Sequence, residues 1–230
     1  MTARMAERMV EATVSVRAAT GAVSAVVVVL PGGKAESYAP TASQQLTRLR
    51  MVPFARAIAR HGRQHGVEVW TVHYRVRGWN GPDASPVPDV RWALAEVRRR
   101  HGDVPVVLVG HSMGGRAALR VAGAPCVVGV VALAPWLPDS EPVERLGDRR
   151  VLIVHGSADL VTSPRASRRY ARRLDGVARC VGYLRVCGEM HAMIFRPRVW
   201  HRVTVSYVLN VLGLAPLPGR WRRALVRGYV

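Results

Sequence analysis

The sequence has 230 residues, of which 49% are apolar and 21% are charged, so it is long enough to bury one large core. Apolar residues recur along the whole chain, which excludes a mainly disordered protein, and three cysteines are too few for a disulfide-stapled miniprotein. The formal net charge of +19 points to polyanionic partners, but Lys34 is the single lysine, and this preference for arginine favours a compositional bias of the genome instead. Cys180 and Cys187 lie in one short segment where they could not easily pair, so a reducing, cytoplasmic setting is expected.

Six short apolar segments are typical of buried strands. They cover residues 23–30, 67–74, 104–109, 127–134, 151–155 and 179–186. Five segments with helical spacing lie between and after them, at residues 52–65, 87–101, 112–122, 164–174 and 197–212. This alternation predicts an α/β fold: a single-domain three-layer sandwich with a mostly parallel, twisted sheet flanked by helices. Ligands then collect at the carboxyl ends of the strands.

The two ends of the chain differ from this alternating region, which we assign to residues 23–213. Residues 1–22 form an N-terminal segment in which Glu11 to Ala19 are compatible with an antiparallel edge strand. Residues 214–230 form a basic C-terminal tail with room for one short helix. The longest apolar run, Val23 to Leu30, is less than half of the roughly 20 residues that a membrane-spanning helix needs, so no membrane span is predicted.

A Gly-x-Ser-x-Gly motif, Gly110-His111-Ser112-Met113-Gly114, comes directly after the strand at 104–109 and directly before a helix. A serine on such a sharp strand-to-helix turn holds its hydroxyl above the sheet edge, and the flanking glycines let strand and helix approach closely. The Met113 amide, at the start of the helix, can then donate to a developing oxyanion. The motif predicts that Ser112 is a nucleophile.

A serine hydroxyl is a poor nucleophile at neutral pH and needs a base and a residue that orients the base. His191, just past the last predicted strand, is the base candidate. Asp159, just after the strand at 151–155, is the acid candidate, with Asp139 as its rival. The predicted triad is Ser112, His191 and Asp159.

These motifs resemble those of the α/β-hydrolase fold family over about Val23 to Leu212, with serine, acid and histidine in the family's usual order. The resemblance implies a second oxyanion donor at the Gly33 amide, with Lys34 second, although Leu30 to Lys34 lacks the His-Gly often found there. It also implies an absent or minimal lid, because the interval between Ala134 and Arg150 is too short for a helical insertion.

The resemblance implies a serine hydrolase acting on a small-molecule carboxylic ester or thioester through an acyl-enzyme intermediate. Acyl transfer or amide hydrolysis would use the same residues. A binding module for nucleic acid or anionic surfaces is the alternative from another class, although no specific nucleic-acid partner is expected. Apolar side chains at strand ends are candidate walls of the substrate pocket: Trp79, Trp136, Met113, Met190 and Met193. No metal-ligand spacing or phosphate-cradling glycine loop is present, so no metal or cofactor is expected, and the oligomeric state is not predicted.

Overall fold

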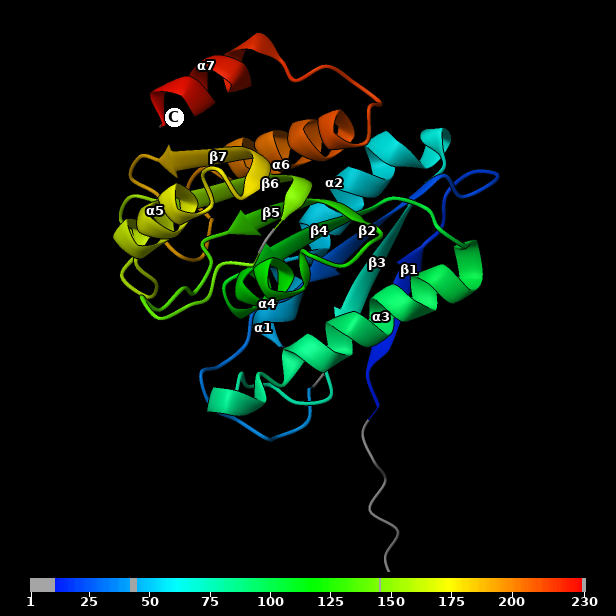
Figure 1. The fold of residues 1–230 in the computed structure, drawn as a ribbon, viewed down its shortest axis with the longest axis horizontal. Helices are drawn as coiled ribbons and strands as arrows, with labels where there is room; N and C mark the ends of the chain where they lie inside the picture. The colour runs from blue at the N-terminus through cyan, green and yellow to red at the C-terminus, as the bar shows by residue number, and fades with distance from the viewer. Residues whose placement is uncertain (1–10, 42–44, 145, 229–230) are drawn as a thin grey trace, which may run out of the picture.

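The computed structural model describes residues 11–41, 45–144 and 146–228. Seven strands form one sheet in the order β1-β3-β2-β4-β5-β6-β7 (Figure 1). The strands are β1 (Thr13–Arg17), β2 (Ala25–Leu30), β3 (Val67–His73), β4 (Val106–His111), β5 (Val127–Leu133), β6 (Gly147–Gly156) and β7 (Ala178–Val186). The α-helices are α1 (Leu46–Leu49), α2 (Val52–Gly62), α3 (Pro86–His101), α4 (Met113–Val121), α5 (Pro164–Arg173), α6 (Pro197–Val211) and α7 (Gly219–Arg227). Two 3₁₀ turns, η1 (Arg63–His65) and η2 (Gly81–Asp83), complete the described elements.

All neighbouring strands of the sheet pair in parallel except β1, which pairs antiparallel with β3 at one edge. The central strands β2 and β4 are buried on both faces, as their continuous runs of β-branched residues predict. The expected α/β sandwich and the antiparallel strand within residues 11–19 are therefore present in the structure. Strand β6 begins at Gly147 rather than at residue 151, because its first polar residues pair through the backbone with β7.

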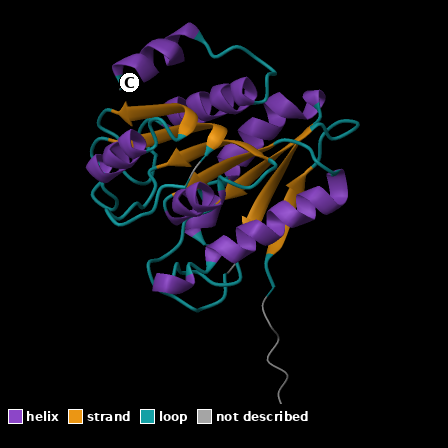
Figure 2. Ribbon diagram, viewed as in Figure 1, coloured by secondary structure: helices purple, strands orange, loops and turns teal. Residues whose placement is uncertain are grey.

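Helices cover both faces of the sheet, which makes three layers (Figure 2). One core lies between the sheet and helices α3, α4 and α5, and it includes Trp70, Leu108 and Tyr170. The other lies between the sheet and helices α2, α6 and α7, and it includes Phe54 and Trp200. Helix α7 occupies part of the expected basic tail and packs on β7, which places the end of the described chain beside that edge strand.

The parallel arrangement brings the carboxyl ends of β4, β6 and β7 to one edge of the sheet (Figure 1). The segment between β5 and β6 contains no helix in its described residues, 134–144 and 146, so no helical insertion covers the edge from that connection. No helix in the described ranges is both long and apolar enough to cross a membrane.

Candidate active site

Ser112 occupies a sharp turn between β4 and α4, with φ of +53° and ψ of −118°. A residue with a side chain rarely adopts this backbone conformation, and it persists only where the surroundings enforce it. Gly110 and Gly114 permit the close packing behind the turn. A Cβ on Gly110 would lie 2.2 Å from the Gly114 carbonyl oxygen, and one on Gly114 would lie 2.2 Å from the Leu30 carbonyl oxygen. The two glycines therefore allow the turn that carries the serine at the sheet edge.

Two backbone segments meet beside this turn. Met113 is the first residue of α4, so its amide has no acceptor within the helix. Gly33 packs against Met113 so closely that a Cβ on it would lie 2.4 Å from the methionine Cε and 2.4 Å from the Arg77 carbonyl oxygen. The Lys34 amide, in contrast, already donates to the Arg77 carbonyl oxygen over 2.9 Å. Within the described part of the chain, the Gly33 amide has no backbone acceptor, so of the two residues considered for the second donor Gly33 is the better candidate.

His191 and Asp159 are hydrogen-bonded to each other on the loops that follow β7 and β6. The distance from His191 Nδ1 to Asp159 Oδ2 is 2.8 Å. Because a carboxylate accepts hydrogen bonds, the proton of the neutral imidazole lies on Nδ1, and Nε2 is left as a base. Of the three residues of the predicted triad, the structure brings His191 and Asp159 into contact, and within the described residues no hydrogen bond joins the Ser112 hydroxyl to His191.

The rival carboxylate, Asp139, lies elsewhere. It is exposed and pairs with Arg169 on α5, with 2.5 Å between Asp139 Oδ1 and Arg169 Nη2. The structure therefore brings Asp159, and not Asp139, to the histidine.

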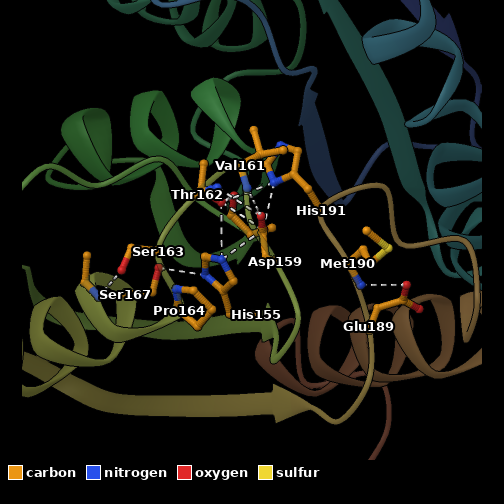
Figure 3. Close-up of polar contacts among 12 residues, drawn as sticks. His155, Asp159, Val161, Thr162, Ser163, Pro164, Ser167, Glu189, Met190 and His191 are labelled. Carbon is orange, nitrogen blue, oxygen red and sulfur yellow. Dashed lines mark hydrogen bonds and ion pairs between the residues drawn. The ribbon is translucent and has the colours of Figure 1, made fainter.

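The Asp159 carboxylate is buried and accepts more hydrogen bonds than the single one from histidine that a triad requires (Figure 3). Its Oδ1 accepts from the amides of Val161 and Thr162, at 2.8 and 2.9 Å. Its Oδ2 contacts the Thr162 hydroxyl at 2.9 Å and the His155 ring at 3.1 Å, in addition to His191. Burial alone would raise the pKa of Asp159, but the hydrogen bonds from His155, His191 and the Thr162 amide outweigh burial and lower it. The carboxylate is therefore ionised throughout the physiological range.

Thr162 and His155 are site residues that the sequence prediction missed. His155 is fully buried and bridges Ser167 Oγ, 2.8 Å from its Nδ1, and Asp159. The Thr162 hydroxyl lies 3.1 Å from His191 Nδ1 and within hydrogen-bond distance of His155. His155 begins the His155-Gly156-Ser157-Ala158-Asp159 segment on which the family resemblance rests, but as a histidine that closes a strand it is expected to have a structural role. Thr162 is a loop threonine that belongs to no motif.

Glu189 fixes the loop that carries His191. Its side chain is fully buried, and Oε1 accepts from the amides of Met190 and Phe195 while Oε2 accepts from the amide of Arg196, at 3.0, 3.3 and 2.7 Å. These bonds span the loop on both sides of the histidine. A buried carboxylate that satisfies three amides restrains the backbone, so Glu189 is a positioning residue for His191.

His111, which precedes Ser112, packs against the catalytic candidate His191, with 4.7 Å between the ring centroids. The ring is completely buried, and its Nε2 donates to the His191 carbonyl oxygen over 3.1 Å. Burial, followed by the nearby charge of His191, lowers the pKa of His111 to about 3. His111 is therefore neutral at the pH at which most enzymes work.

This neutral histidine predicts a pH dependence of stability. Between about pH 6.5 and pH 3 the unfolded chain binds a proton at residue 111 and the folded chain does not, so the free energy of unfolding falls as the pH is lowered through this window. In urea denaturation, we expect the free energy of unfolding of the wild-type protein to decrease between pH 6.5 and pH 5. In His111→Phe this decrease should be smaller by about 1–2 kcal/mol. Equal losses in the two proteins would contradict a neutral His111.

Two of the residues expected to form pocket walls, Trp79 and Trp136, pack around Arg116. The Arg116 guanidinium lies 3.8 Å from the Trp79 ring and 4.6 Å from the Trp136 ring. Trp79 is only 2% exposed, so its expected position on an open pocket wall is not supported: the indole is used to cover the guanidinium. Trp136 is half-buried, and part of its surface remains accessible.

The expected methionine walls also differ in burial. Met113 and Met193 are buried, whereas Met190 is 40% exposed beside His191. Met190 therefore keeps surface on which a ligand can rest. Among the described residues, no group of three or more histidine, cysteine, aspartate or glutamate side chains is arranged to hold a metal ion.

The model of the alpha/beta hydrolase family matches residues 27–230. Solved structures with the same fold include an alpha-beta serine hydrolase homologue from Coxiella burnetii, at 16% identity and a TM-score of 0.63, covering 86% of this chain and 91% of that one. A serine hydrolase without a lid from Xanthomonas campestris matches at 18% identity and a TM-score of 0.61, covering 90% and 91%.

A thermophilic esterase from Thermogutta terrifontis, solved with propionate bound, matches at 16% identity and a TM-score of 0.62, covering 90% of this chain and 92% of that one. No match was found among curated protein sequences. At these identities the solved structures establish the fold of the chain.

Proposed function

Because the chain belongs to the alpha/beta hydrolase family, we propose that it is a serine hydrolase of carboxylic esters or thioesters with Ser112, His191 and Asp159 as its triad. The observation that carries the proposal is the turn at Ser112, with φ of +53°, at the same sheet edge as the 2.8 Å hydrogen bond between His191 and Asp159. A serine on such a turn and an imidazole oriented by a carboxylate at one sheet edge are the parts that acyl transfer requires.

The proposed reaction has two halves. Ser112 Oγ attacks the carbonyl carbon of the ester while its proton passes to His191 Nε2, and Asp159 stabilises the imidazolium that forms. The imidazolium then gives this proton to the departing alcohol or thiol, and an acyl group stays bound to Ser112. Water attacks the acyl-enzyme with His191 again acting as base, and the carboxylic acid is released. His155 and Thr162 act through Asp159, since both hold its Oδ2 in place.

The oxyanion of each tetrahedral intermediate is proposed to accept hydrogen bonds from the amides of Met113 and Gly33. Both amides are part of rigid backbone, one at the start of α4 and the other packed against the Met113 side chain. Donors that are fixed before the reaction stabilise the developing charge without having to reorganise.

Gly33→Ala tests the second donor. The added Cβ would lie 2.4 Å from the Arg77 carbonyl oxygen, so the backbone at residue 33 has to move. We expect kcat for p-nitrophenyl acetate to fall by about 10²-fold or more with a smaller change in KM, because an oxyanion donor acts in the transition state.

Gly21→Ala supplies the matched control, because residue 21 lies in a loop where a Cβ meets no atom within 4 Å. Its φ of +81° gives the substitution a backbone cost of its own, and the added Cβ makes no contact near Ser112. A Gly33→Ala enzyme with unchanged kcat would remove Gly33 from the proposed oxyanion hole.

Exposed apolar side chains on the loops around the triad support an acyl group as the substrate's reacting part. Ile194 and Phe195 follow β7 and His191, and both have most of their surface exposed. Apolar surface of this kind binds hydrocarbon chains rather than charged groups. The Thermogutta terrifontis esterase of the same fold was solved with propionate, a short carboxylate.

Covalent labelling with a fluorophosphonate tests the proposal directly. The reagent reacts with an activated serine and should attach one group to the wild-type protein, on the peptide that contains Ser112, as located by mass spectrometry. Ser112→Ala should take up none. A wild-type protein that remains unlabelled, or is labelled at another serine, would contradict the assignment of Ser112 as nucleophile.

A further inference from the structure

A cavity of about 850 Å³ is lined by the loop that carries Asp159, by α5 and by β7. Its lining includes Asp159 and Thr162, the neighbouring Leu160 and Val161, three arginines and Tyr183, but not Ser112. Gly228, whose carbonyl oxygen accepts from the Arg185 amide over 2.9 Å, also lines the cavity. The volume is in the range of small-molecule sites.

The three arginines of this cavity, which we call the arginine cavity, are Arg165 and Arg168 on α5 and Arg185 on β7. None of the three forms an ion pair with a carboxylate within the described part of the chain. The single acidic residue in the lining is Asp159, whose oxygens are buried and occupied by the bonds described above. Among the described residues, the lining therefore carries three arginine charges that no carboxylate neutralises.

Some arginines elsewhere in the described chain do have carboxylate partners. Arg116 and Arg120 share the buried Glu141, and Arg169, which neighbours Arg168 on α5, pairs with Asp139. Like charges that converge without a counter-charge repel one another, so such an arrangement is stabilised by a bound anion. Arg168 and Arg185 both lie near the Tyr183 hydroxyl. Burial raises the pKa of Tyr183, and the positive charges of the two arginines oppose that rise. Both guanidinium groups are therefore in electrostatic reach of the same hydroxyl.

We propose that the arginine cavity, which is lined in part by Asp159 and Thr162 but not by Ser112, is a binding site for a ligand that carries a phosphate group. Guanidinium groups bind phosphate oxygens through paired, charge-assisted hydrogen bonds, and a phosphate monoester offers three oxygens and about two negative charges to three arginines. The apolar part of the ligand would rest on Leu160 and Val161, whose surfaces are 90% and 72% exposed. A soluble phosphate ester and a phospholipid headgroup share this chemistry.

The test compares two double variants with equal loss of charge. Arg168→Gln/Arg185→Gln removes two cavity arginines, and Arg172→Gln/Arg179→Gln removes two exposed arginines of the same helix and strand that do not line the cavity. Binding of inorganic pyrophosphate is measured by isothermal titration calorimetry at fixed salt, and binding of phosphatidylcholine vesicles with and without phosphatidic acid is measured by co-sedimentation. Thermal melts establish that both variants fold.

We expect saturable binding to the wild-type protein that weakens by about tenfold or more in the cavity variant and by less than about twofold in the control. Loss of pyrophosphate binding identifies a soluble phosphate as the ligand, and selective loss of vesicle binding identifies a headgroup. Equal weakening in the two variants, or no binding of either probe to the wild-type protein, would overturn the proposal. Because no turnover is measured, these results do not depend on the proposed hydrolase activity.

Discussion

Ser112→Ala is expected to lower kcat for p-nitrophenyl acetate by about 10⁴-fold or more, with KM changed much less. Ser112 lies on the turn between the central strand β4 and helix α4, and alanine has no hydroxyl oxygen with which to form the acyl-enzyme. The backbone turn is maintained by the packing of Gly110 and Gly114, so the variant should keep its fold.

The hydrolysis rate of Ser112→Ala has to be distinguished both from the wild-type rate and from the uncatalysed rate in buffer. Removing one triad member can leave roughly 10³ to 10⁴-fold catalysis over water, since the oxyanion donors and substrate binding remain. Rates should therefore be compared with the buffer reaction and with Ser140→Ala, an exposed loop serine that serves as the control. If Ser112→Ala and Ser140→Ala both hydrolyse the ester at the wild-type rate, the proposed function is wrong.

The sequence predicted most of the sheet because its strands are continuous β-branched runs buried on both faces, as in β2 and β4. It also predicted that His191 and Asp159 meet, because each follows a parallel strand and such ends share one edge. Both inferences use periodicity and chain order, which are local properties of the sequence. The start of β6 could not be predicted in this way, because its polar first residues are held by backbone pairing with β7.

The contacts that surround the triad depend on tertiary structure. Thr162 is brought to His191 by the turn after Asp159, and Glu189 is buried so that its carboxylate can accept from amides that follow it. Trp79 was predicted to be a pocket wall because it is an aromatic residue that follows a strand. In the structure its ring packs against Arg116 of helix α4 instead. No pattern in the sequence indicates which side chain an indole will pack against.

Asp159→Asn should lower kcat by about 10⁴-fold, and the structure gives the reason. Oδ1 accepts from two backbone amides, so the amide oxygen of asparagine is retained on that side and its NH₂ group faces His191. The NH₂ group donates, which forces His191 Nδ1 to become an acceptor and moves the ring proton to Nε2. An imidazole protonated at Nε2 has no lone pair with which to accept the Ser112 proton.

Asp139→Asn is the matched control, since Asp139 follows the neighbouring strand but pairs with Arg169 at the surface. It should retain activity within about twofold of the wild-type enzyme, because exposed ion pairs contribute little. Asp159 also anchors Thr162 and His155, so thermal melts must establish that Asp159→Asn is folded at the assay temperature. A folded Asp159→Asn enzyme with near-normal kcat, or a loss confined to Asp139→Asn, would mean that another group orients His191. In this structure the Thr162 hydroxyl, 3.1 Å from the same nitrogen, is the neighbour that would have to do so.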